Sequence, residues 1–155
     1  MGDPNVERWR QRGTIAMWMN RHRHREWNIV ADDDACDGLV QLLDLMEIGE
    51  WSSKRELRLT KPVKTPDHGG VFPFRSATQL TIKYPKDRVP DDHWHFTEND
   101  RQLLLEIGLT RLQEMRDAIK DMKKGGGDYC IGDQDSNPLW IWWWIKDFIV
   151  PKTAT

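Results

Sequence analysis

An aromatic segment near the end of the chain constrains the fold more than any other feature. Residues 139–145 read LWIWWWI, the longest apolar run in the sequence, and include four of its nine tryptophans. Successive side chains of a strand point to opposite faces, so a strand here carries large apolar side chains on both faces. Such a strand lies buried between two covered faces, or one of its faces meets a partner. We favour the buried strand, and the second interpretation supplies a hypothesis about function.

Two amphipathic helices are predicted from apolar residues at helical spacing. The first covers residues 33–48, and the second covers residues 110–124. Thr110 and Gln113 fit a capping box at the start of the second helix, and Gly125 is placed to end it. Each helix has one apolar stripe, so each is expected to pack on a sheet through that stripe.

Strands are predicted where apolar and polar side chains alternate. In chain order these segments are 14–19, 28–31, 56–60, 78–84, 93–97, 102–107, 129–131 and 139–145. Residues 61–76 contain prolines and glycines and are expected to form a loop. The sequence therefore predicts an α+β fold, with a mostly antiparallel sheet of about five to seven strands and two helices packed on one face.

Charge divides the chain into two unequal parts. The 155 residues carry a net charge of −2, but residues 1–27 contain six arginines and three acidic residues and carry +3. A chain of this length is typical of one domain. We therefore expect a basic, tryptophan-containing arm over residues 1–30 and a single α+β domain over residues 31–155.

Composition and cysteine content narrow the class of protein. The small negative net charge gives no global basic field for nucleic acid or an anionic membrane. Cys36 and Cys130 lack the spacing of a disulfide framework or a zinc site. The first residues contain no apolar stretch, so no signal peptide is expected. We expect a soluble, cytoplasmic protein without a cofactor.

His93 and His95 are the best candidates for metal ligands. They flank Trp94, and residues two apart on a strand share a face, so both imidazoles could bind one metal ion. The simpler interpretation places Trp94 and Phe96 in the core and both histidines in solvent. A metal-dependent enzyme using His93 and His95 is therefore kept as an alternative function.

The basic segment RHRHR at residues 21–25 is a candidate nucleic-acid contact. It lies between Trp18 and Trp27, and cations beside aromatic rings are typical of such contacts. The acidic remainder of the chain argues against this interpretation. A nucleic-acid-contacting accessory protein that uses the basic arm is the second alternative.

The predicted order of elements resembles that of small bacterial proteins that bind another protein, including immunity-type proteins. This resemblance is one of architecture, and it implies a small non-enzymatic protein of immunity or accessory type. A protein partner or self-association is expected, because tryptophan is enriched at the centres of interfaces. The predicted partner-binding residues are Trp140, Trp142, Trp144, Trp18, Trp27, Arg23 and Arg25.

Overall fold

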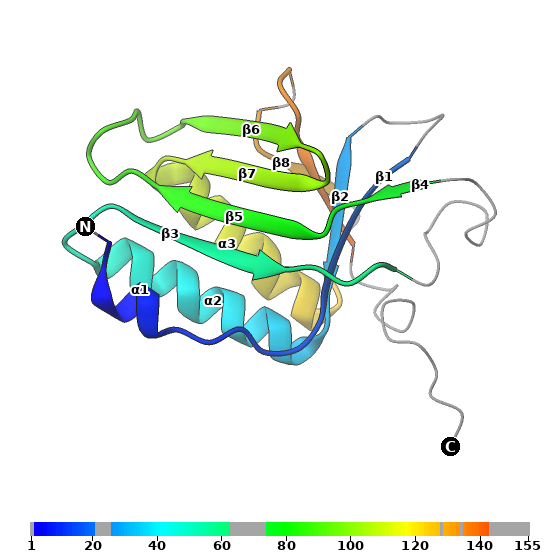
Figure 1. Cartoon of the computed structure of the whole chain (residues 1–155), viewed down its shortest axis with the longest axis horizontal. Helices are drawn as coiled ribbons and strands as arrows, with labels where there is room; N and C mark the ends of the chain where they lie inside the picture. Colours follow the sequence, from blue (N-terminus) through cyan, green and yellow to red (C-terminus); the bar gives the residue numbers. More distant parts are fainter. Residues whose placement is uncertain (1, 21–25, 63–73, 128, 134, 143–155) are drawn as a thin grey trace.

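The structure is a computed structural model that describes residues 2–20, 26–62, 74–127, 129–133 and 135–142. Within these residues the chain forms three helices and nine strands, and the predicted α+β class is confirmed (Figure 1). In chain order they are α1 (Pro4–Arg8), β1 (Ile15–Asn20), β2 (Trp27–Ala31), α2 (Asp33–Ile48), β3 (Ser53–Arg58), β4 (Phe74–Ser76), β5 (Gln79–Tyr84), β6 (Trp94–Asn99), β7 (Gln102–Ile107), α3 (Leu109–Lys124), β8 (Tyr129–Ile131) and β9 (Leu139–Ile141).

The described strands form two sheets rather than one. Sheet A has the order β4-β1-β2-β9-β8, and sheet B has the order β3-β5-β7-β6. Each sheet contains one parallel pair, β2 with β9 and β5 with β7, among antiparallel neighbours. The chain leaves sheet B after β3, where Thr60 N–H donates to Ile15 O at 2.8 Å, and Ala77 N–H donates to Met17 O at 3.0 Å before β5 begins. These two contacts with β1 place β4 in sheet A, inside the segment expected to be a loop.

The two long helices lie side by side on one face of sheet B (Figure 1). Asp32 caps α2 by accepting a hydrogen bond from Ala35 N–H at 2.9 Å, and α2 has the predicted bounds. The predicted stripe of α3 is buried at Leu112, Met115, Ile119 and Met122. These side chains share one core with the inward side chains of sheet B, including Leu80, Ile82 and Leu105.

The start of α3 differs from the prediction. Gly108 is the N-cap residue and makes no side-chain capping bond, so the capping box at Thr110 is wrong. A side chain at Gly108 would collide with the backbone carbonyl of Pro90, which explains why a glycine rather than a capping side chain stands there. Gly125 ends the helix in the left-handed conformation, with φ of 95°, as predicted.

The described part of residues 1–30 is packed into the domain and does not form a separate arm. Strands β1 and β2 occupy the middle of sheet A, and the expected division at residue 30 falls inside β2. Val6, Trp9 and Trp18 are buried, and the Trp9 indole donates to Gly38 O in α2 at 2.9 Å. Among the described helices, none has both the length and the apolar content needed to cross a membrane.

Candidate functional site

Trp18 and Trp27, predicted as partner-binding residues, are placed in the interior. Trp18 is 0% exposed and Trp27 is 3% exposed. They lie on adjacent strands, where Trp27 faces the main core and Trp18 packs with Ala16 and Val30 in a separate cluster. Three of the predicted residues lie outside the described residues: Trp144, Arg23 and Arg25.

Trp140 and Trp142 are half-buried, and both indole N–H groups are engaged inside the chain. Trp140 Nε1 donates to the Glu26 carboxylate, and Trp142 Nε1 donates to Asn28 Oδ1 at 2.8 Å. Trp142 also packs against the cluster that contains Trp18. The segment that contains β9 therefore contacts the segment that contains β2 through side-chain hydrogen bonds. The role of these tryptophans in partner binding stays a prediction.

His93 directly precedes β6 and His95 is its second residue, with Trp94 and Phe96 buried as expected. His95 is exposed as expected, but His93 is half-buried, and its Nε2 is buried without a hydrogen-bond partner among the described residues. The two imidazole rings are 6.3 Å apart and tilted by 51°. His93 Nε2 lies 3.9 Å from Glu106 Oε1, which is too far for a hydrogen bond. Among the described residues, no group of three or more His, Cys, Asp or Glu side chains could hold a metal ion. The described residues therefore supply no third ligand to a metal site at His93 and His95.

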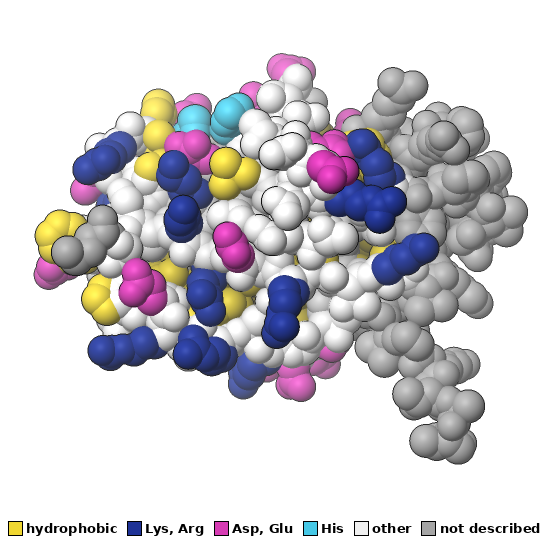
Figure 2. All heavy atoms as spheres, viewed as in Figure 1, with side chains coloured by type: hydrophobic (Ala, Val, Ile, Leu, Met, Phe, Trp, Pro, Cys, Tyr) yellow, Lys and Arg dark blue, Asp and Glu magenta, His cyan; other side chains and the backbone are white. Residues whose placement is uncertain are grey.

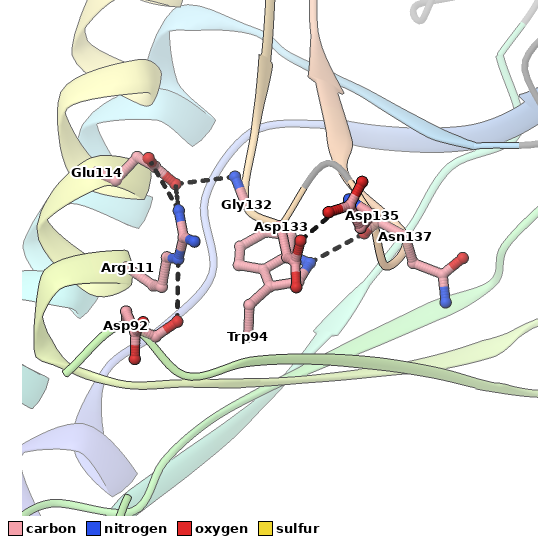
Figure 3. A network of polar contacts seen from close by, with 8 residues as sticks. All are labelled: Asp92, Trp94, Arg111, Glu114, Gly132, Asp133, Asp135 and Asn137. Carbon is pink, nitrogen blue, oxygen red and sulfur yellow. Dashed lines mark hydrogen bonds and ion pairs between the residues drawn. The ribbon is translucent and has the colours of Figure 1, made fainter. Parts of the chain in front are cut away.

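The polar turn between β8 and β9 contacts both sheet B and α3 (Figure 3). The Trp94 indole in β6 donates to Asn137 O at 2.9 Å. The Glu114 carboxylate on α3 accepts a hydrogen bond from Gly132 N–H at 2.8 Å. The turn is therefore held by sheet B on one side and by α3 on the other, which fixes β8 and β9 beside the helix.

Cys130 lines a cavity of about 490 Å³ between α3 and β8. Burial raises the pKa of the Cys130 thiol, and the negative charge of Glu26 raises it further. Burial and the hydrogen bond to Asp121 also raise the pKa of Tyr129, which lines the same cavity. A raised pKa keeps the thiol protonated at neutral pH, which is the opposite of what an activated nucleophile requires.

One face of sheet B is left open by the described helices. Both long helices lie behind this sheet in Figure 1, and no described helix covers the face towards the viewer. The strand register aligns short polar and charged side chains across the open face, in rows around Leu104. Two neighbouring rows are Thr81, Leu104 and Thr97, and Lys83, Glu106 and His95.

A basic edge borders the open face along β3. We define the basic edge as Arg10, Lys54, Arg55 and Arg58, and Figure 2 shows Lys and Arg side chains gathered along this border. The Gln11 side-chain amide joins the N-terminal segment to β3, since it donates to Arg58 O at 2.7 Å and accepts from Arg58 N–H at 2.8 Å. The basic edge is therefore formed by two segments that are distant in sequence.

Comparison with known proteins gives no family for this chain. No protein-family model matches the sequence, and no curated protein matches it.

The sequence indicates a basic N-terminal segment, but it does not indicate that the basic residues of β3 lie beside it. The segment 53–58, SKRELR, holds three basic residues, and this cluster is the local signal that could have been noticed. Nothing in the sequence pattern indicates that Gln11 pairs with Arg58, because these residues are 47 positions apart. The open face and its basic edge follow from the topology.

Proposed function

We propose that this protein is a non-enzymatic binding protein that holds a partner protein against the open face of sheet B. The observation that carries the proposal is an uncovered sheet face bordered by a basic edge, on a chain whose net charge is −2. Concentrated positive charge on a slightly acidic protein favours a partner whose contact surface is negative. Leu104, surrounded by threonines, provides a small apolar centre for such a contact.

Charge also favours a protein over nucleic acid as the partner. Glu56 and Glu106 stand on the open face, where they would repel a continuous line of phosphates. An acidic protein surface can place its carboxylates opposite the basic edge and leave Glu56 and Glu106 in solvent. The partner is therefore an acidic protein surface, and nucleic acid becomes an outcome of the tests below.

Site-specific photo-crosslinking in the native cells tests this proposal. A photoreactive phenylalanine derivative replaces Thr81 at the middle of the open face, and the matched control replaces the exposed Lys120 on α3. We expect one protein adduct, identified by mass spectrometry, from position 81 and none from position 120. The purified partner should then form a stoichiometric complex in sedimentation, and Arg58→Glu should weaken that complex.

Two results would contradict the proposed function. The first is an absence of any adduct specific to position 81 when the variant is folded and expressed. The second is the same set of adducts from positions 81 and 120, which would mean that contacts at the open face are nonspecific.

A further inference from the structure

A cavity lies where the N-terminal segment meets the border of sheet B. Its volume is about 320 Å³, and its lining includes Arg10, Gln11, Arg55, Glu56 and Arg58. Side chains of β3 alternate between the two faces, so Arg55 and Arg58 approach the cavity from opposite faces of the strand. The cavity therefore wraps around the outer edge of β3.

The three arginines of this cavity carry charge that no described carboxylate neutralises. None of them forms an ion pair with an acidic residue of the described chain. Arg10 Nη1 lies 3.3–3.4 Å from the carbonyls of residues 7–9, at the long end of hydrogen bonding. Guanidinium groups bind carboxylates through paired N–H donors, and these groups retain that capacity.

Arg55 is held in place while part of its guanidinium stays unused. Its Nη2 donates to Trp9 O at 2.8 Å, and its guanidinium lies 5.8 Å from the centre of the Trp9 ring. Its Nε is buried and has no hydrogen-bond partner among the described residues. An anion that reaches this nitrogen would satisfy a buried donor, which adds to the favourable free energy of binding.

The backbone of β3 supplies a further donor at the same place. Arg58 directs its N–H and C=O away from β5, because both groups bond with the Gln11 side chain. In an antiparallel pair, residues two apart direct these groups to the same side, so Glu56 also directs its N–H to the outer edge. Gln11 therefore occupies one pairing position on this edge, and no described residue bonds to the preceding position, at Glu56.

We infer that this cavity is a carboxylate-binding site that receives Asp or Glu side chains from an extended acidic segment of the partner protein. The inference rests on the proposed function and names the chemistry of the partner. The guanidinium groups bind the carboxylate, and the open backbone position at Glu56 aligns the segment with β3. Three positive charges against the single carboxylate of Glu56 set the sign of the ligand.

A carboxylate on an extended peptide fits this cavity better than a free phosphate because of the strand edge beside it. The cavity is lined by Glu56 as well as by the arginines, at the position where β3 directs a backbone N–H outward. This backbone donor favours a peptide, since an extended chain can continue along the strand edge and a free phosphate cannot.

NMR titration of the full chain with an oligo-glutamate peptide tests the inference. We expect shifts at the Glu56 backbone N–H and at the Arg55 side-chain Nε–H, and none with an oligo-glutamine peptide. Arg58→Gln removes one charge-assisted contact and should weaken binding about tenfold. The control Arg88→Gln removes the same charge from an exposed turn and should leave affinity unchanged within about twofold.

Each other outcome overturns the inference. Absence of shifts at Glu56 and Arg55 with oligo-glutamate would show that the cavity takes no carboxylate. Tighter binding of inorganic phosphate or of a single-stranded oligonucleotide at the same signals would assign the cavity to phosphate. Equal weakening by Arg58→Gln and Arg88→Gln would show attraction by net charge alone. In each case crosslinking at position 81 can still identify a partner, so the proposed function stands or fails separately.

Discussion

Trp9 offers the sharpest test of whether the N-terminal segment is part of the core. Its side chain is 5% exposed and lies beneath Arg55, and its indole N–H donates to Gly38 O at 2.9 Å. One side chain thus contacts α2 and β3 together. Replacing it with alanine removes the packing, the hydrogen bond and the cation–π contact at once.

The expected loss can be estimated from these contacts. Truncation of a buried tryptophan to alanine costs about 3–5 kcal/mol in the free energy of unfolding. A domain of this size has a total stability of about 5–15 kcal/mol, so Trp9→Ala should remove a large part of it. Urea unfolding followed by far-ultraviolet circular dichroism measures the loss without relying on the fluorescence of the deleted indole.

Trp51→Ala is the matched control, since the same substitution is made at a side chain that is 57% exposed. Its effect should stay within about 0.5 kcal/mol. A loss below about 1 kcal/mol for Trp9→Ala, or equal losses for both variants, would refute the reasoning. Either result would mean that residues 1–12 are only loosely attached to the core.

Four further predictions concern stability, metal binding and assembly. Ile119→Ala truncates a side chain that is 1% exposed and should cost about 2–5 kcal/mol, and a loss under about 0.5 kcal/mol would mean that α3 is not packed there. The double variant His93→Ala, His95→Ala should change stability by no more than about 0.5 kcal/mol, whereas stoichiometric zinc that is lost in the variant would favour the metal hypothesis. Burial alone would raise the pKa of Glu47, but the hydrogen bonds from two side chains of α3 outweigh this effect and bring the pKa below its ordinary value of 4.5. The stability that Glu47 contributes is therefore present above that value and is lost as the pH falls through the folded-state pKa, so Glu47→Gln should flatten the acid limb of a stability–pH curve. Deletion of residues 1–27 removes β1 and should expose apolar surface and cause self-association, and a product that is folded by circular dichroism and sediments as a monomer would contradict this.

Local signals predicted the two long helices and most strands, but neither α1 nor the arrangement of the elements. The cap at Asp32 and the apolar stripe that follows it both act within a few residues, so the bounds of α2 could be predicted. The parallel pairs β2 with β9 and β5 with β7 join strands that are not consecutive, and alternation within a strand carries no information about its neighbour. Two sheets therefore appear where the sequence predicted one.

The candidate site was hard to predict for the same reason. The frequency of tryptophan at interfaces predicts a partner-binding role for Trp18, but the same large apolar surface makes it a core residue once β1 lies inside a sheet. Arg58 carries no local signal of function, because a charged residue at the end of a strand is ordinary. Its importance comes from Gln11 and Arg10, which reach it only through the path of the folded chain.

The charge of β3 also bears on which chain can pair with its edge. An open strand edge accepts any extended chain, including a second copy of the same protein, and charged side chains on the edge are a common protection. Lys54 and Arg58 stand on either side of Glu56, and all three are exposed. Two copies paired through this edge would bring two basic edges together, and their repulsion disfavours self-association there. The same basic side chains attract an acidic segment. One set of side chains therefore both repels a second copy of the protein and favours binding of the proposed partner.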